Sequence, residues 1–278
     1  MYKKLIVGSL ALLTAGSMLT TSVYASEIYG NPVMTAESET AAESETAAED
    51  EILPAVIDEH SVEGFVARLY RTLLLREPDA VGLAEWSAVL RSGKETGADI
   101  VSGFVFSKEF VGNDYSDEQY IEVLYNAILG RASDPQGLAD WCEEFDDGLS
   151  RACVCAGFTG SKEFDELCKS YGIVTGKTKL TKPADLYPEM TKFVTRAYRL
   201  ILSREPDDSG LNAWVTQLYT GKNTAADIMY GFTESKEFKD KKLSDEDYIS
   251  VLYRVVLDRE PDGDGIRNWL DVMHGEDA

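Results

Sequence analysis

The feature that most limits the possible fold is a segment that occurs four times along the chain. In each copy a tyrosine is followed by a tryptophan at one constant spacing, in the pairs Tyr70 and Trp86, Tyr125 and Trp141, Tyr198 and Trp214, and Tyr253 and Trp269. The step from the first tyrosine to the second equals the step from the third to the fourth, while the middle step is longer. A pair of units has therefore itself been duplicated. A repeat of this length predicts small units that bury their apolar faces partly against one another.

Each unit begins with apolar side chains spaced like those along one face of an α-helix. In the first unit they are Phe65, Val66, Leu69, Tyr70 and Leu73, and the same spacing starts again at residues 120, 193 and 248. This period is typical of an amphipathic helix, whereas a half-buried strand alternates at every second residue. No segment of the sequence shows that alternation. We therefore expect an all-α helical repeat protein of two tandem domains, each made of two similar three-helix units.

The repeat also gives the expected boundaries. We expect a first helical domain over residues 61–174 with units at 62–114 and 116–173, a connector over 175–189, and a second helical domain over 190–278 with units at 190–242 and 244–278. The last unit lacks a third helix and the Ser-Lys-Glu-Phe segment found at 107–110, 161–164 and 235–238. Its apolar face therefore needs cover from the neighbouring unit, the connector or a partner, and a second copy as partner would give self-association.

A turn motif follows the first helix of each unit. Its usual form is Arg-Glu-Pro-Asp, and the second unit departs from it with Arg-Ala-Ser-Asp-Pro. The residue before a proline is pushed out of the α region, so we expect the first helix to stop here and the aspartate to cap the next helix. A glycine three residues after the aspartate permits close approach of another element. The predicted structural residues are Arg76, Pro78, Asp79, Gly82, Trp86, Arg131, Asp134, Gly137, Trp141, Arg204, Pro206, Asp207, Gly210, Trp214, Arg259, Pro261, Asp262, Gly265 and Trp269.

These motifs resemble a family of bacterial domains of unknown function, number 4214, which is common in secreted proteins. The residues that match are Leu69-Tyr70, the stretch from Arg76 to Trp86, Gly93, and the stretch from Gly103 to Phe110. The resemblance covers residues 62–173 and 190–278. The arginine-proline turn is also similar, more loosely, to that of phycobilisome linker domains, which assemble other proteins without doing chemistry. Neither resemblance supplies catalytic residues.

Residues 1–60 differ in composition from the repeats. Residues 1–25 have two lysines, an apolar stretch and a small-x-small sequence at Val23–Ala25, which is typical of a secretory signal peptide. Residues 26–60 hold ten acidic residues and no lysine or arginine, and they repeat Ala-Glu-Ser-Glu-Thr-Ala. Such a segment has too few apolar side chains to offset the entropy of ordering, so we expect a disordered acidic linker. These features predict a secreted, extracellular protein that can associate with the cell surface.

The charge of the chain excludes some classes of partner. It has 49 acidic and 27 basic side chains, for a formal net charge of −22. Nucleic-acid binding needs a basic face to neutralise phosphates, and an anionic membrane would repel an acidic protein. We therefore expect no nucleic acid as a partner. The mature chain also has no apolar run of a length that could span a membrane.

Catalytic and metal-binding readings find little support in the residue types. The two histidines, His60 and His274, lie outside the repeated positions, which argues against a serine or cysteine hydrolase with a histidine base. The recurring aspartates are explained by helix capping. Asp262 and Asp264 hint at a calcium loop, but the other oxygen ligands of such a loop are missing. We predict no enzyme, no cofactor and no metal.

Two recurring residue types have both a structural and a binding interpretation. The arginines could hold an acidic ligand group, or bridge the end of each first helix to the following aspartate. The tryptophans could stack on sugar rings, or belong to the core. Repetition at a fixed place in every unit favours the structural interpretation of both.

All four cysteines lie in the second unit, at Cys142, Cys153, Cys155 and Cys168. Secretion favours disulfides, and three pairings are possible on paper. A third helix that folds back on the second would bring Cys168 near Cys142. We predict that bond, which leaves Cys153 and Cys155 free or available to a partner.

Taken together, the sequence predicts a non-catalytic binding protein that recognises an extracellular protein or glycan. The binding surface is expected in a groove between units, lined by residues outside the repeated core set, with the connector around Lys177–Lys182 as one candidate. The alternative is a structural linker of an extracellular assembly that docks through the incomplete fourth unit. A carbohydrate-active enzyme is a third possibility, which would need an acidic cleft absent from the repeat.

Overall fold

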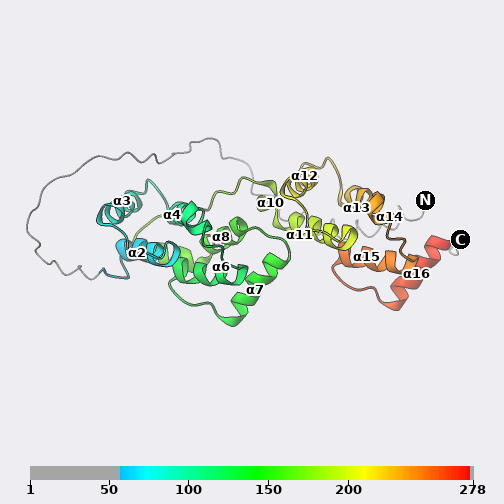
Figure 1. Cartoon of the computed structure of the whole chain (residues 1–278), viewed down its shortest axis with the longest axis horizontal. Coiled ribbons are helices and arrows are strands. Elements are labelled where there is room, and N and C mark those ends of the chain that lie inside the picture. The colour runs from blue at the N-terminus through cyan, green and yellow to red at the C-terminus, as the bar shows by residue number, and fades with distance from the viewer. Residues whose placement is uncertain (1–56, 276–278) are drawn as a thin grey trace, which may run out of the picture.

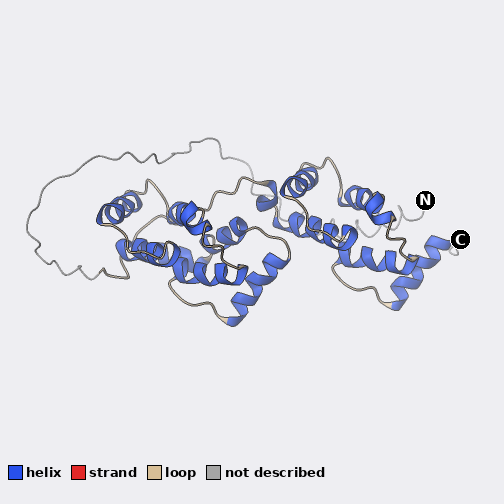
Figure 2. Ribbon diagram, viewed as in Figure 1, coloured by secondary structure: helices blue, strands red, loops and turns tan. Residues whose placement is uncertain are grey.

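The computed structural model describes residues 57–275 of the chain. The predicted signal peptide and residues 26–56 of the predicted acidic linker lie outside the described residues. Between residues 57 and 275 the chain consists of helices, turns and loops, without a strand (Figure 2). The prediction of an all-α repeat protein is confirmed.

The first pair of units has two sets of helices in the same order. Its first unit comprises α2 (Val62–Leu73), α3 (Ala80–Arg91), α4 (Gly97–Val105) and the short α5 (Lys108–Val111). Its second unit comprises α6 (Asp117–Leu124), the π-helical continuation η2 (Tyr125–Leu129), α7 (Pro135–Asp146), α8 (Arg151–Thr159) and α9 (Lys162–Tyr171). Figure 1 shows this pair in blue to green.

The second pair repeats the arrangement. A short connector helix, α10 (Pro183–Leu186), leads into the third unit, which comprises α11 (Pro188–Ala197), the π-helical η3 (Tyr198–Leu202), α12 (Asp208–Tyr219), α13 (Ala225–Thr233) and α14 (Lys236–Lys239). The fourth unit comprises α15 (Asp245–Leu257) and α16 (Gly263–His274). The two pairs follow one another along the long axis of the molecule (Figure 1).

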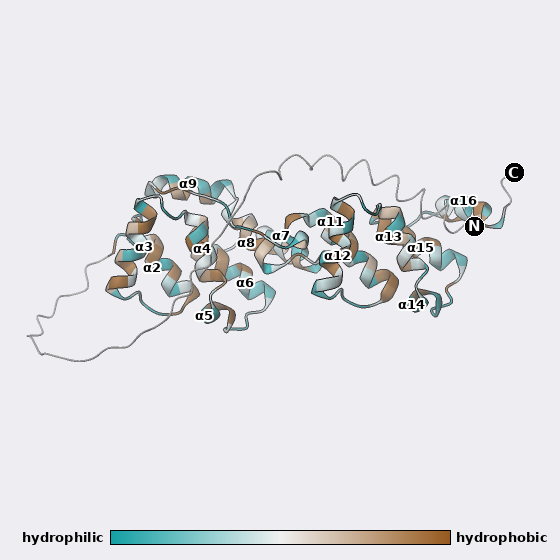
Figure 3. Ribbon diagram, turned by 90° about the horizontal axis from the view of Figure 1, so that it is seen from above, coloured by the Kyte–Doolittle hydropathy of each residue, from teal (hydrophilic) through white to brown (hydrophobic). Residues whose placement is uncertain are grey.

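Each pair of units has its own apolar core. Buried side chains from α2, α4, α6, η2, α8 and α9 form one cluster, and those from α11, η3, α13 and α15 form most of the other. Apolar and polar residues lie on different sides of single helices, as the amphipathic pattern predicts (Figure 3). The two units of each pair are also joined by an arginine: Arg68 Nε donates to Ala127 O at 3.0 Å, and Arg196 Nε donates to Val255 O at 2.8 Å.

The first helix of each unit stops where the turn motif begins, as the sequence predicted, but the proline is not what stops it. It ends at a residue in the left-handed conformation that directly precedes the repeat arginine. These residues are Leu75, Gly130, Ser203 and Asp258, with φ of 53°, 69°, 55° and 51°. A left-handed residue is the usual C-terminal stop of a helix, and three of these four carry the steric cost of a β-carbon there.

The Ser-Lys-Glu-Phe segment of the second unit forms a longer helix than the four-residue helices of the same segment in the first and third units. It opens the ten-residue helix α9, which crosses to the first unit (Figure 3). There the rings of Phe164 and Tyr171 lie 6.3 and 5.8 Å from the ring of Phe65. The chain after α9 then caps α4, because Gly97 N donates to Val174 O at 2.8 Å. This helix therefore joins the two units of the first pair.

The first helix of the fourth unit is covered from within the chain. The apolar side chains of α15 are buried, and Tyr253 is only 6% exposed. The cover comes from α11, η3 and α16, which all contact α15. Of the three possible covers named above, the neighbouring unit is the one that packs on α15, through α11 and η3.

None of the helices between residues 57 and 275 combines the length and the apolar character needed to cross a bilayer.

Candidate functional site

In the first three units the repeat tyrosine and tryptophan meet a phenylalanine from the third helix. Tyr125 and Phe158 are in an edge-to-face arrangement, with ring centroids 4.9 Å apart, and Trp141 stacks on the same phenylalanine at 5.0 Å. The first unit repeats these contacts with Tyr70, Trp86 and Phe104, and the third with Tyr198, Trp214 and Phe232. The fourth unit has no third helix within residues 57–275, and there Trp269 Nε1 donates to Tyr253 Oη at 3.2 Å.

The repeat arginines lie over the tyrosine rings. The guanidinium carbons of Arg76, Arg131, Arg204 and Arg259 stand 4.9, 4.9, 4.8 and 5.1 Å from the ring centroids. This geometry allows a cation–π interaction in every unit.

The main carboxylate partner of these arginines is not the one that the sequence suggested. The aspartate of the turn approaches only in the second unit, where Arg131 Nη1 and Asp134 Oδ2 are 3.7 Å apart. Instead, the glutamate of Ser-Lys-Glu-Phe forms the ion pair in the first three units: Arg76–Glu109 at 3.0 Å, Arg131–Glu163 at 2.6 Å and Arg204–Glu237 at 3.2 Å. Hydrogen bonds from Arg131 hold the pKa of Glu163 below its ordinary value. The arginine therefore joins the turn to the end of the unit.

The aspartates of the turn cap the second helices, as predicted. Asp79, Asp134, Asp207 and Asp262 each accept from the backbone N–H three residues on, at 2.6 to 2.9 Å. That N–H belongs to the repeat glycine, and the tyrosine hydroxyl lies so close to each of these glycines that a β-carbon would collide with it. The capping aspartate, the repeat glycine and the repeat tyrosine of each unit therefore lie in one cluster.

The tryptophans are half-buried rather than fully enclosed. All four lie at the edge of a core cluster, with one part of the indole against it and the rest at the surface. The repeat residues are therefore engaged with one another in all four units. Arg259 is the exception among the arginines, because it has no ion pair within residues 57–275.

The two pairs of units meet at a polar joint between α7–α8 and α10–α11. Lys192 of α11 lies 3.0 Å from Glu144 and 3.1 Å from Asp147. Arg199 donates to the carbonyl of Asp146, and Ser150 Oγ donates to Asp185 Oδ1 at 2.7 Å. Because Lys192 is mostly buried and has two acidic partners, this joint fixes the second pair against the first.

One surface beside the joint departs from the repeat pattern. In the first unit, Arg91 at the end of α3 forms an ion pair with Glu63. The equivalent position at the end of α12 is Tyr219, whose ring stacks on Tyr187 with a centroid distance of 4.6 Å and an interplanar angle of 12°. Tyr219 is 42% exposed and the adjacent Leu186 is 49% exposed. We call Leu186, Tyr187 and Tyr219 the tyrosine face.

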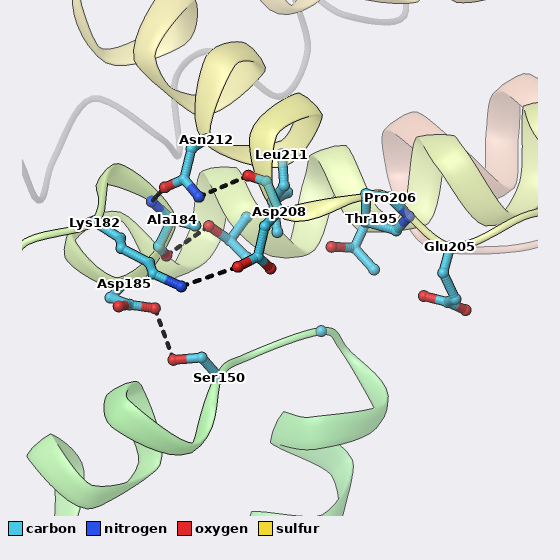
Figure 4. A pocket seen from close by; sticks show the side chains of 12 residues that line it. Ser150, Lys182, Ala184, Asp185, Thr195, Glu205, Pro206, Asp208, Leu211 and Asn212 are labelled. Carbon is cyan, nitrogen blue, oxygen red and sulfur yellow. Dashed lines mark hydrogen bonds and ion pairs between the residues drawn. The ribbon is translucent and has the colours of Figure 1, made fainter. Parts of the chain in front are cut away.

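A pocket of about 230 Å³ lies at the joint itself. Gly148 and Ser150 line it from the first pair, and residues of α10, α11 and the start of α12 line it from the second (Figure 4). Lys182 Nζ lies 3.0 Å from Asp208 Oδ2, and Asn212 Oδ1 accepts from the backbone N–H of Ala184 at 3.0 Å. The pocket thus joins residues of the connector and of two units.

Comparison with known proteins identifies the repeat. A family model described as "Domain of unknown function (DUF4214)" matches residues 55–113, 111–168, 185–242 and 240–277. The chain belongs to this family. No curated protein matches the chain, and no solved structure matches it. The Tyr–Trp–Phe–Arg–Glu clusters of this chain therefore lie within its DUF4214 units.

The cysteines of the second DUF4214 unit are all free thiols, so the predicted Cys142–Cys168 bond is not formed. The reason is the position of α9, which does not fold back on α7. It places Cys168 beside Gly97 of the first unit, while Cys142 lies on α7 near the acidic start of α6. Burial raises the pKa of Cys153 to about 11 and that of Cys168 to about 12. Thiols of this kind are poor nucleophiles at neutral pH.

The C-terminal histidine and the acidic loop of the fourth DUF4214 unit have ordinary surroundings. His274 lies 3.3 Å from Asp245, and Asp264 pairs with Arg267 in the first turn of α16. The part of the chain between residues 57 and 275 has no cluster of three or more potential metal ligands. The site features of this protein that depart from the repeat are thus the tyrosine face and the joint pocket.

Proposed function

We propose that this DUF4214 repeat protein is a secreted, non-catalytic binding protein that recognises an extracellular protein or glycan at the bacterial cell surface. The observation that supports it is the tyrosine face, because these residues replace an ion pair of the first unit and are not needed for the repeat cluster. The recurring aromatic and charged residues of the first three units, by contrast, are paired inside their own units.

The chemistry of the tyrosine face suits recognition rather than catalysis. Stacked tyrosines offer a flat apolar surface with polar hydroxyl groups, and they lose little conformational entropy when they are covered. One face of the Tyr219 ring is held by Tyr187, Tyr219 is 42% exposed, and Leu186, the residue before Tyr187, is also exposed. A sugar ring or an apolar side chain of a partner protein could stack on this surface.

A binding screen with one matched pair of variants tests the proposal. Purified protein is applied to a glycan array and to intact cells of the producing bacterium. We expect saturable binding to at least one of them, and Tyr219→Ser to weaken it about tenfold, as for a central aromatic contact. Tyr230→Ser, at an exposed tyrosine of α13, is the control and should bind like the wild type. If both variants bind equally well, the tyrosine face takes no part in binding and the proposal is wrong.

A second candidate function is that of an assembly linker, and Arg259 favours it. In the other three units the equivalent arginine pairs with a glutamate of a Ser-Lys-Glu-Phe segment. A partner that supplies such a carboxylate would complete the fourth unit, and a second copy would give self-association. Sedimentation over a range of concentrations tests this: association that Arg259→Met abolishes would support a linker, and a monomer throughout would favour the binding function.

A further inference from the structure

The fourth unit contains most of the repeat cluster. Asp262 caps α16 at the backbone N–H of Gly265, and the hydroxyl of Tyr253 lies close to that glycine, as in the other units. Trp269 Nε1 donates to the same hydroxyl at 3.2 Å, and the guanidinium carbon of Arg259 lies 5.1 Å from the centroid of the Tyr253 ring. The contacts that the turn and the second helix supply are therefore formed in this unit.

Two contacts of the cluster are missing from the fourth unit. In each of the first three units a phenylalanine of the third helix packs on the tyrosine ring, and the glutamate of the following Ser-Lys-Glu-Phe segment pairs with the arginine. Between residues 57 and 275 the fourth unit has no third helix, and no carboxylate forms an ion pair with Arg259. This unit therefore lacks one aromatic and one acidic side chain.

Arg259 makes the same local contact as the paired arginine of the second unit. Arg131 Nη1 donates to the carbonyl of the next residue, Ala132, at 3.1 Å, while its Nε and Nη2 donate to the carboxylate oxygens of Glu163 at 2.6 and 2.8 Å. Arg259 Nη1 likewise donates to the carbonyl of the next residue, Glu260, at 3.3 Å. Because a guanidinium binds a carboxylate best through two parallel hydrogen bonds, Arg259 is held ready to receive one.

The two missing side chains have a fixed relation in the units that contain them. Both belong to one segment, Gly-Phe-x-x-Ser-Lys-Glu-Phe, at residues 103–110, 157–164 and 231–238. The phenylalanine lies near the end of one helix, and the serine caps the next helix, whose first turn carries the glutamate. A ligand that completes the fourth unit must therefore present a phenylalanine and a glutamate at this spacing.

A second copy of the chain has no such segment free. Its glutamates are in ion pairs at 3.0, 2.6 and 3.2 Å, and its phenylalanines are at most 5% exposed. A second copy would have to open its own core to donate one of these segments, at the cost of the buried aromatic contacts. The fitting partner is a different protein chain in which such a segment is unpaired.

From these observations we propose that the fourth unit binds a helical segment of another protein that carries a phenylalanine and a glutamate at the spacing of Phe158 and Glu163. The phenylalanine packs on the ring of Tyr253 beside Trp269, and the glutamate accepts two hydrogen bonds from Arg259. The negative charge of the glutamate complements the guanidinium. The proposal deepens the linker function, on which it rests, by naming another protein rather than a second copy as the partner.

A peptide titration tests the proposal. A fluorescein-labelled peptide of residues 150–164, which carries Phe158 and Glu163, is titrated with the full chain under reducing conditions, and its fluorescence anisotropy is measured. We expect saturable binding. Phe158→Ala in the peptide should weaken it about tenfold or more, and Glu163→Gln about threefold, since such an ion pair is partly exposed to solvent. Lys162→Gln is the matched control, because the Lys162 side chain is 89% exposed.

Variants of the chain locate the peptide. Arg259→Met should weaken binding of the wild-type peptide about threefold but should not weaken the Glu163→Gln peptide further, because both changes remove the same ion pair. Arg267→Met, at an exposed arginine of α16, controls for net charge and should bind like the wild type. The peptide variants preserve the test if Arg259→Met does not fold.

Three results would overturn the proposal: no saturable binding, equal binding of the wild-type and Phe158→Ala peptides, or independent effects of Arg259→Met and Glu163→Gln. Such a failure is distinguishable from failure of the linker function itself. Sedimentation of the chain alone measures self-association without any peptide, so self-association that depends on Arg259 would keep the linker function while this choice of partner is rejected.

Discussion

The hydroxyl of Tyr198 lies 2.7 Å from the position that a β-carbon on Gly210 would occupy. The tyrosine ring cannot move aside freely, because Phe232 packs against it with ring centroids 4.9 Å apart and the guanidinium carbon of Arg204 lies 4.8 Å from its centroid. The glycine of the turn is thus required by contact and not by backbone conformation.

Gly210→Ala should therefore destabilise the protein although alanine favours helices. Overpacking of a filled site costs about 1–3 kcal/mol. Gly103→Ala is the control, because a β-carbon on this helical glycine of α4 would meet no atom within 4 Å, so the substitution should gain about 0.5–1 kcal/mol. Urea unfolding of the wild type and both variants gives the two values, and a stabilising Gly210→Ala would contradict the contact.

Leu75→Gly should stabilise the protein. Leu75 ends α2 in the left-handed conformation with φ of 53°, and it is 67% exposed, so the substitution relieves strain and loses little contact. The expected gain is about 1 kcal/mol in the free energy of unfolding. The same replacement at an ordinary exposed helical position, Ala84→Gly in α3, should cost about as much. A loss of stability in Leu75→Gly would contradict the assigned helix end.

The contacts of the repeat residues show what the sequence could and could not predict. Apolar spacing and the repeat predicted the helices, their caps and the tight glycine contacts, because those depend on local residue types. The sequence could not show that Arg131 pairs with Glu163, since that contact joins residues 32 apart and depends on how the third helix returns. A nearly constant sequence separation from each arginine to the glutamate of Ser-Lys-Glu-Phe, 33, 32 and 33 residues, was the available signal.

The other features that the sequence did not predict arise from contacts between units. The length of α9 depends on the apolar surface around Phe65 of the first unit, and no local pattern in residues 161–171 reveals that surface. The same holds for the joint, where Ser150 of one pair and Asp185 of the next are brought together by the way the two pairs of units meet. The predicted disulfide failed for this reason, since it assumed that the third helix brings Cys168 back to the start of the second, whereas Cys168 lies beside Gly97 of the first unit.

The thiols provide a direct test of the α9 position. With four free cysteines, a thiol reagent should titrate four groups per chain in denaturant without reductant. In the native protein the reaction should be slow at Cys155 and Cys168, because both are buried and burial raises the pKa of each to about 12. A count of two in denaturant, with Cys142 linked to Cys168, would contradict the structure.

Acid should weaken the links between the turn and the end of each unit. The folded pKa of Glu163 is lowered by Arg131, and that of Asp134 chiefly by the N–H of Gly137. A lowered folded pKa stabilises the protein at pH values above the unfolded pKa, and this contribution is lost as the pH falls below about 4.

Glu163→Gln isolates one of these links. At pH 7 it should cost about 0.5–1 kcal/mol, since the pair is partly exposed to solvent. The difference from the wild type should shrink toward zero as the pH is lowered through the titration of the carboxylate. Glu166→Gln, at an exposed residue of the same helix that lies 3.4 Å from Lys162, should have a smaller effect. A difference that grows in acid would contradict the sign of the pKa shift.

The central claim is that the repeated residues build the scaffold while the tyrosine face performs recognition. The most direct test is the binding of fluorescently labelled wild type, Tyr219→Ser and Tyr230→Ser proteins to cells of the producing bacterium, with folding checked by circular dichroism. The account predicts saturable binding by the wild type and by Tyr230→Ser, and a loss of about tenfold in Tyr219→Ser. Saturable binding that is equal in all three folded proteins would contradict it.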